Sequence, residues 1–317
     1  MPDALPGVRL PSPRRLQDLA EALGGSLDDD ARDVVVHTVS SPENASANCL
    51  VPILQSRAVT ALADPSAVVL VIPELAGRFP PGRRWVHEHA RWALARLLQT
   101  ASPPRSETLI SPQAIIELGA AVAPTVRVGH GAVVLAGAVI GQDSTIEPRA
   151  VIYGSVRIGR RVVVGAGAVV GRPGFGWAHG PDGQVLRMPQ LGGVDIEDDV
   201  EIGALATVDA GTLKPTRLRR GCKLDAQVHV GHNVEIGEAT MVAAQTGFAG
   251  SVTVGRNVLI GGQVGVADHA TIGDHARLAG RSGVIGHIPP HATVAGYPAV
   301  DRMRWLRAVA RMMRGRS

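Results

Sequence analysis

The sequence of 317 residues is poor in aromatic side chains, which make up 3% of it, and it contains only two cysteines. Cys49 and Cys222 cannot build a disulfide framework for so long a chain, which favours a reducing compartment. No apolar run reaches the roughly 18 residues that a membrane-spanning helix needs, and no signal peptide opens the chain. The net charge of +4 implies no strongly anionic partner. These absences predict a cytoplasmic protein with no transmembrane segment and no nucleic-acid partner.

In place of aromatics, the sequence is rich in glycine and β-branched residues, and from Ile110 onward an apolar residue recurs at every sixth position. One unbroken series runs from Ile110 to Val170, a short one from Ile196 to Val208, and a third from Leu218 to Val284. Six residues are three strand alternations, so each anchor residue points inward while the chain turns between anchors. This period predicts a mainly β, parallel β-helix of stacked coils. Because three hexads make one coil, residues 18 apart should lie about 4.8 Å apart, one above another.

The rhythm is missing from residues 1–105, for which we predict a small N-terminal α/β unit that recognises substrate. Helices are expected over 12–25, with Ser12 as N-cap and Pro13 in the first turn, and over 85–99. Short buried strands are expected over 34–36 and 67–72. Ser102-Pro103-Pro104 resembles a linker, so the β-helix domain should span 106–297.

Two further segments leave the repeat. Residues 171–193 are rich in turn residues and hold Phe175 and Trp177, which indicates a loop ejected from the coils. Such loops are often functional, although a merely tolerated insertion would look the same. Residues 298–317 predict a C-terminal basic helix, capped by Asp301. Its cations are either the solvated face of a capping helix or a docking surface for an acidic protein. These cations are Arg302, Arg304, Arg307 and Arg311.

The densest polar segment surrounds His232, which follows the anchor Val230 by two residues and should therefore point out of the coils. A neutral histidine can take a proton from an amine or hydroxyl. Gly250 lies one coil further on at the same offset, and its backbone N–H suits a developing oxyanion. The pair is the minimal machinery for acyl transfer without a covalent enzyme intermediate, and no nucleophile set of the Ser/His/Asp or Cys/His kind is evident.

Most of the eleven histidines are better interpreted as surface imidazoles, as we expect for His229, His275 and His291. A different interpretation is a zinc lyase resembling γ-class carbonic anhydrases, which bind zinc through histidines at subunit interfaces. The spacings of His229 with His232 and of His287 with His291 could ligate a metal. Those enzymes lack this N-terminal unit and this aromatic loop, so we expect no metal. A non-catalytic scaffold is a third possibility.

Several motifs along the chain resemble the UDP-3-O-acylglucosamine N-acyltransferases of lipid A biosynthesis. Besides the hexads and the first helix of the N-terminal unit, they are Arg172–Trp177, Met188–Gly192, Val230–Val234, Ala243–Gly247, Gly261–Gly265 and Ser282–Val284. The resemblance implies a homotrimer of left-handed β-helices with active sites between subunits. It implies no tightly bound cofactor, and a donor acyl group on the 4'-phosphopantetheine of acyl carrier protein, or on CoA.

The resemblance also implies roles for individual residues. His232 would be the general base, Gly250 the oxyanion donor, and the C-terminal basic helix would face the acidic carrier protein. His269 would lie near the acyl-phosphopantetheine groove. The other residues expected to bind substrate or acyl donor are Asp225, His229, Asn233, Gln245, Gln263, His287, Phe175 and Trp177.

The sequence departs from the family where the acceptor is recognised. The family's Ile-Asp-Asn is Leu224-Asp225-Ala226 here, and Asp-Arg-Gly is Asp209-Ala210-Gly211. His229 stands where glutamine is common. The aromatic segment that holds uracil is replaced by Leu50–Ser56, which has no aromatic residue. Acyl transfer to a small-molecule amine is therefore predicted more firmly than a UDP-linked glucosamine acceptor, and a paralogue acylating another amine from acyl-CoA is the alternative.

Overall fold

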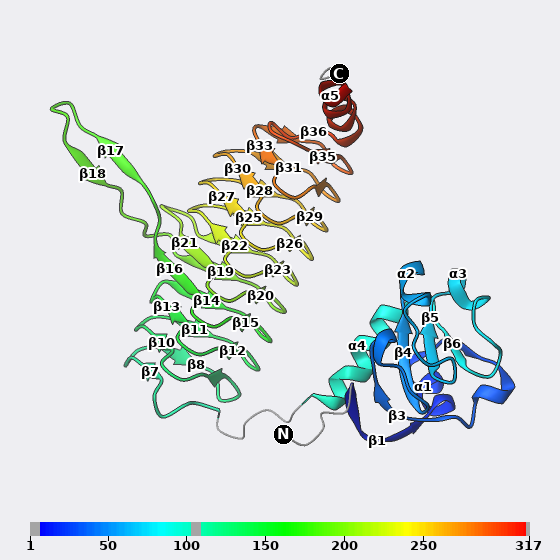
Figure 1. Ribbon diagram of the computed structural model, residues 1–317. Helices are drawn as coiled ribbons and strands as arrows, with labels where there is room; N and C mark the ends of the chain where they lie inside the picture. Colours follow the sequence, from blue (N-terminus) through cyan, green and yellow to red (C-terminus); the bar gives the residue numbers. More distant parts are fainter. Residues whose placement is uncertain (1–6, 103–108, 315–317) are drawn as a thin grey trace. The chain divides into compact units, whose positions relative to one another are not determined.

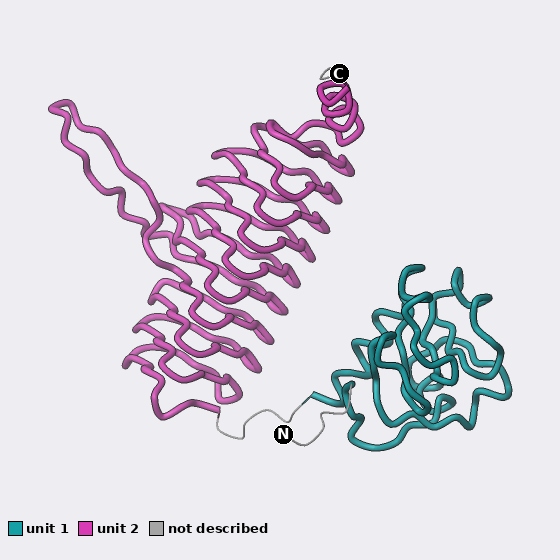
Figure 2. Tube along the Cα trace, viewed as in Figure 1, with its two compact units in different colours: residues 1–105 teal, residues 106–317 magenta. Residues whose placement is uncertain are grey.

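The computed structural model describes residues 7–102 and 109–314, and the chain divides into two compact units, 1–105 and 106–317 (Figure 2). The second unit is a left-handed parallel β-helix, with short strands stacked into three flat faces (Figure 1). The hexads predict the stacked coils, and the family resemblance implies their left-handed sense. The predicted linker begins at Ser102, the last described residue before the gap, and otherwise falls outside the described residues.

The strands of each face are hydrogen-bonded in parallel to the coils before and after them, with one antiparallel exception, β36. Face 1 contains β7 Ile115–Ile116, β10 Val133–Val134, β13 Val151–Ile152, β16 Val169–Pro173, β21 Thr207–Ala210, β24 His229–Val230, β27 Gly247–Phe248, β30 Gly265–Val266 and β33 Gly283–Val284. Face 2 contains β8 Ala121–Val122, β11 Val139–Ile140, β14 Val156–Ile158, β19 Val194–Ile196, β22 Thr216–Leu218, β25 Glu235–Ile236, β28 Thr253–Val254, β31 Thr271–Ile272 and β34 His287–Ile288. Face 3 contains β9 Arg127–Val128, β12 Thr145–Ile146, β15 Val163–Val164, β20 Glu201–Ile202, β23 Lys223–Leu224, β26 Met241–Val242, β29 Leu259–Ile260, β32 Arg277–Leu278, β35 Thr293–Ala295 and β36 Val300–Asp301.

The register confirms the predicted step of 18 residues in most coils, whereas the step is 38 from Ile158 to Ile196, across the ejected segment, and 22 from Ile196 to Leu218. Val230 pairs with Phe248 and Phe248 with Val266, and all three side chains are buried in one continuous core of anchors. Ile110, the first anchor of the series, forms only an isolated bridge to Val128 and is exposed, because no coil precedes it.

The corners between faces restrict the residue type at two positions of each hexad, for two different reasons. The third residue after an anchor adopts a positive φ, as at Gln227 (59°) and Gln245 (62°). The glycine directly after an anchor is needed for space instead: a Cβ on Gly141 would lie 2.6 Å from the carbonyl oxygen of Gly159 in the next coil. Close approach of the next coil, and not a positive φ, is therefore what requires glycine at this position.

Two appendages interrupt the coils. The ejected segment contains the antiparallel hairpin β17 Trp177–His179 and β18 Val185–Arg187, which projects away from the coils in Figure 1. The C-terminal helix α5, Arg302–Arg314, follows the last coil, and the backbone N–H of Arg304 donates to Asp301 Oδ1 at 3.0 Å, as the predicted cap requires.

The first unit is a six-stranded sheet in the order β1-β3-β4-β5-β6-β2, in which β3 to β6 run parallel. Its strands are β1 Val8–Arg15, β2 Ser26–Leu27, β3 Val35–Val39, β4 Cys49–Ile53, β5 Val68–Val71 and β6 Arg84–Val86. Its helices are α1 Leu16–Leu23, α2 Ser56–Val59, α3 Pro73–Ala76 and α4 Ala90–Ala101, with short 3₁₀ turns at Asp29–Ala31 and Pro42–Asn44.

Two predicted helix starts in this unit are wrong. Ser12 and Pro13 lie in β1, which pairs with β3, and the helix begins only at Leu16 with Arg15 as its N-cap. Trp85 lies in β6, where it pairs with Leu70, and the helix that follows begins at Ala90. Pairing with neighbouring strands overrode the local helix signals in both places.

Candidate active site beside the ejected hairpin

The corner after β24 presents His232, and the corner one coil further on presents Gly250 directly against it. A Cβ added to Gly250 would lie 2.5 Å from Cε1 and 2.6 Å from Nε2 of His232, so the imidazole rests on the glycine backbone. Among the described residues no acceptor takes the Gly250 N–H. The structure therefore brings the predicted pair together, with no room for a side chain between its members.

A chain of hydrogen bonds sets the tautomer of His232. Asn233 directs its amide N–H group to the Lys214 carbonyl at 3.0 Å and accepts the backbone N–H of Thr212 on Oδ1 at 3.2 Å. The same Oδ1 lies 3.1 Å from His232 Nδ1. Because this oxygen can only accept, Nδ1 carries a proton, and in the neutral imidazole the lone pair is therefore on Nε2. Nε2 is then the nitrogen available to act as a base.

A buried carboxylate lies behind the two histidines of this segment. Asp209 is 1% exposed, pairs with Arg172 at 2.9 Å, and its Oδ2 is 3.8 Å from His229 Nε2. Burial raises the pKa of the Asp209 carboxyl, while the charges of Arg172 and the histidines oppose that rise. His229 Nδ1 lies 2.6 Å from the Thr207 hydroxyl, so this side chain, expected on the surface, is held in the network and only half-exposed.

The ejected segment lies beside His232 and forms with it an open cavity of about 800 Å³. Phe175, Trp177, Met188 and Gln190 line it together with His232. Phe175 is 80% exposed and meets Trp177 edge-on, at 6.4 Å between ring centroids. Of the predicted binding residues, the structure thus places Phe175 and Trp177 in the cavity that His232 lines.

Sequence reasoning missed the residues that fix this geometry. Gln190 accepts the Thr212 hydroxyl at 2.7 Å and so ties the base of the hairpin to the Asn233 network. Gly174 passes so close that its Cβ would lie 3.0 Å from the Cβ of His232. Nothing in the sequence indicated that Asp209 is buried. The only available signal was that turn residues and polar residues gather where the hexads stop.

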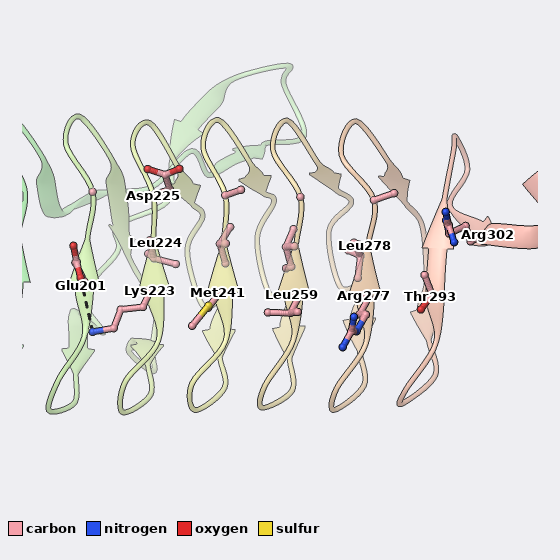
Figure 3. Close-up of a pocket in the computed structure, with 16 residues that line it drawn as sticks. Glu201, Lys223, Leu224, Asp225, Met241, Leu259, Arg277, Leu278, Thr293 and Arg302 are labelled. Carbon is pink, nitrogen blue, oxygen red and sulfur yellow. Dashed lines mark ion pairs between the residues drawn. The ribbon is translucent and has the colours of Figure 1, made fainter. Parts of the chain in front are cut away.

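Other predicted residues lie away from this cavity. Asp225 lines a groove on face 3 whose walls are outward side chains of successive coils, including Lys223, Met241 and Leu259 (Figure 3). Gln245 and Gln263 form part of a ladder at the corner between faces 3 and 1, where each glutamine amide donates to the previous one at 2.8 Å. Arg281 continues this ladder by donating to Gln263.

The remaining histidines are dispersed. His269 is exposed, and its backbone N–H donates to the Gly250 carbonyl at 3.1 Å, so it lies next to the proposed oxyanion donor. His287 lies on face 2 with Thr271, and His291 stacks on His275 with 4.9 Å between centroids. Within residues 7–102 and 109–314, no three His, Cys, Asp or Glu side chains gather as metal ligands.

The basic helix α5 exposes both its charge and its apolar side chains. None of its residues is buried, and Met303, Leu306, Met312 and Met313 are all open to solvent. Arg302 also lines the end of the face 3 groove (Figure 3). No helix in the described parts of the chain is both long and apolar enough to cross a membrane.

Comparison with known proteins agrees with this architecture. The family described as bacterial transferase hexapeptide (six repeats) matches residues 137–172. A UDP-3-O-acylglucosamine N-acyltransferase of Anaeromyxobacter dehalogenans is 35% identical over 320 residues, which cover 93% of this chain and 90% of that protein. The chain belongs to this family. The members from Christiangramia forsetii and Chlorobium luteolum are 53% and 50% identical, but the matched segments span only 23% and 22% of their length and 24% of this chain.

Solved structures of a related acyltransferase share the fold. UDP-N-acetylglucosamine acyltransferase from Campylobacter jejuni superposes with a TM-score of 0.56 at 26% identity, covering 61% of this chain and 73% of that one. The corresponding enzyme of Francisella novicida has a TM-score of 0.54 at 20% identity, covering 63% and 72%. Both alignments leave more than a third of this chain unmatched, and the second shows the fold alone.

The segment that replaces the aromatic residues of the family lies at the end of β4. Leu50 to Ile53 belong to the strand, Gln55 is the N-cap of α2, and Ser56 begins that helix. Leu50, Val51 and Ile53 are buried in the cores of the first unit, so they offer no surface on which a base could stack. This family member therefore differs from the family pattern where acceptor recognition was expected.

Proposed function

We propose that the chain is an N-acyltransferase that moves an acyl group from a 4'-phosphopantetheine thioester to the amine of an amino sugar. The observation that carries this proposal is the contact between His232 and the Gly250 backbone, inside a cavity and with Nε2 free. Family membership supports a place in lipid A biosynthesis and an acceptor related to UDP-3-O-acylglucosamine.

The chemistry needs only these groups. His232 Nε2 removes a proton from the acceptor amine as its nitrogen attacks the thioester carbonyl carbon. The new C–N bond forms while the carbonyl electron pair moves to oxygen, where the Gly250 N–H stabilises the oxyanion. The tetrahedral intermediate collapses, the C–S bond breaks, and the thiolate takes the proton from His232. Two neighbours stabilise the transient imidazolium of His232. The carboxylate of Asp209 does so through its negative charge, and Asn233 does so by accepting the Nδ1–H of the ring.

The donor and the assembly belong to the same proposal. Face 1 beyond His229 presents glycine in three successive coils, at Gly247, Gly265 and Gly283, and a Cβ at the first two would meet nothing. Such a smooth strip suits a linear acyl chain. We propose a homotrimer in which a neighbouring subunit covers this strip, and α5 as the surface that meets acyl carrier protein.

Thiol release from acyl carrier protein and acyl-CoA, measured with a panel of amino sugars, tests the function. UDP-3-O-acylglucosamine and a simple amino sugar should separate the proposed acceptor from the paralogue alternative. Replacement His232→Gln should lower kcat by about 10²- to 10⁴-fold. His130→Gln, an exposed histidine of an earlier coil, is the matched control and should keep full activity. A wild-type rate in His232→Gln would refute the base assignment.

A further inference from the structure

A separate, half-open cavity of about 490 Å³ lies on face 2, beside the base of the ejected segment. Its floor is formed by the outward side chains of β14, β19 and β22, three consecutive coils in Figure 1. Its rim contains Gly192, from the end of the ejected segment, together with Ser155 and Pro215. The space is separate from the His232 cavity, with which it shares no lining residue.

The floor carries an unusual row of charges. Arg157, Asp195 and Arg217 occupy paired positions of the three strands, one rung of about 4.8 Å apart. Despite this spacing, within residues 7–102 and 109–314 none of the three side chains makes a hydrogen bond or an ion pair. Two guanidinium groups therefore flank one carboxylate. Glu235, which pairs with Arg217 on the next strand of the face, binds Arg219 instead.

Arg217 provides more specific evidence that this cavity binds a ligand. Its Nε atom is buried and has no hydrogen-bond partner among the described residues. Buried donors are normally satisfied, so a lone one indicates an acceptor that the protein itself does not supply. Elsewhere on the same face, Arg219 shows the usual alternative, because its guanidinium binds both Glu197 and Glu235 at 2.8 Å or less.

The chemistry of the row selects a ligand class. Two arginines two rungs apart, with fork-shaped donors, suit the oxygens of a phosphate or diphosphate. The Asp195 carboxylate between them would repel a bare anion but would accept a hydroxyl group. A phosphate ester that also bears a hydroxyl satisfies all three side chains.

We infer that this space is a binding site for a hydroxyl-bearing phosphate ester, with Arg157 and Arg217 on the phosphate and Asp195 on the hydroxyl. The site rests on the proposed function for its source of ligand, since two substrates of that reaction have this chemistry. One is the sugar-nucleotide diphosphate of the acceptor, and the other is the 4'-phosphopantetheine arm of the donor.

Titration calorimetry on the full chain with UDP, 4'-phosphopantetheine and inorganic phosphate tests the site. Arg217→Gln and Arg157→Gln should each weaken the binding of UDP or of 4'-phosphopantetheine at least tenfold, and the ester affected identifies the source. Arg217→Lys should recover part of the affinity. Arg96→Gln, which removes an exposed arginine of α4, is the charge-matched control and should have no effect. Asp195→Asn should strengthen the binding of inorganic phosphate.

The inference is overturned if neither ester binds, or if both bind Arg217→Gln as tightly as the wild type while its circular dichroism and melting temperature are unchanged. If Arg217→Gln loses binding but also melts at a lower temperature, Arg157→Gln decides the question, because Arg157 has no buried atom without a hydrogen-bond partner. Binding is measured without turnover. If the wild type transfers acyl groups but the arginine variants bind both esters normally, this inference alone is wrong. If the arginine variants lose ester binding but the wild type transfers no acyl group, the proposed function alone is wrong.

Discussion

The two units of the chain hold their side chains in place by different means. In most coils of the β-helix, a strand residue pairs with the residue 18 positions away, so position in the coil decides what a side chain faces. In the first unit, four parallel strands are joined by connections of unequal length, and no fixed step relates paired residues. The comparison teaches that the contact between His232 and Gly250 can be located by counting along the coils, whereas no such count locates contacts in the first unit.

Core substitutions offer the strongest test of this contrast. Phe248→Ala and Trp85→Ala each remove a fully buried aromatic, and each should lower the free energy of unfolding by about 3–5 kcal/mol. Trp85→Ala also loses the hydrogen bond from its Nε1 to the Gly24 carbonyl. In hydrogen exchange, Phe248→Ala should expose mainly adjacent coils, since coils contact only their neighbours, while Trp85→Ala should expose the whole sheet of the first unit. Uniform loss of protection over 109–301 in Phe248→Ala would show that the coils unfold as one block.

The next test concerns the contact that forms the candidate site. Gly250→Ala should push the His232 imidazole aside, because the new Cβ would lie 2.5 Å from its Cε1, and kcat should fall about 10²-fold. Gly77→Ala in the first unit is the control, as its Cβ would meet nothing within 4 Å and its φ is not positive. If Gly250→Ala retained the wild-type kcat in a thiol-release assay, the two residues would not act together.

The basic helix gives a smaller expected effect. Charge reversal at Arg304, Arg307 and Arg311 should raise the KM for an acyl carrier protein donor about tenfold and leave the KM for acyl-CoA unchanged, because only the former presents an acidic surface. Reversal of Arg57, Arg91 and Arg96, three exposed arginines of the first unit, makes an equal change of charge there. Equal effects of the two sets would mean that net charge, and not α5, governs the KM.

The cysteines give the subtlest comparison. Burial raises the pKa of the Cys222 thiol to about 12, so almost no thiolate exists at pH 8.5. In a Cys49→Ser protein, we expect no reaction of Cys222 with a thiol reagent at that pH until the β-helix unfolds. Its reaction rate should therefore follow the unfolding transition of the coils. Rapid labelling of the folded protein would show that the coil around Cys222 opens locally.

Sequence reasoning reached the β-helix and the stacking of His232 on Gly250, because both follow from the period of six. It missed the partners that orient the base, since Thr212 and Gln190 lie in interruptions of that period and approach Asn233 only in three dimensions. It was also wrong about helix starts at Ser12 and Trp85, where strand pairing decided the outcome.

The hexads alone determined the stacked coils, their core and the column that carries His232 and Gly250. A repeat fixes these because each coil buries its apolar anchors only against the next one. Only the tertiary structure decided which polar groups surround that column. The ejected segment contributes residues to the cavity beside His232, Asp209 is buried behind it, and Arg217 on face 2 has a buried donor without a partner among the described residues. These placements depend on contacts between segments that no local pattern links, so the sequence could give the position of the base but not its surroundings.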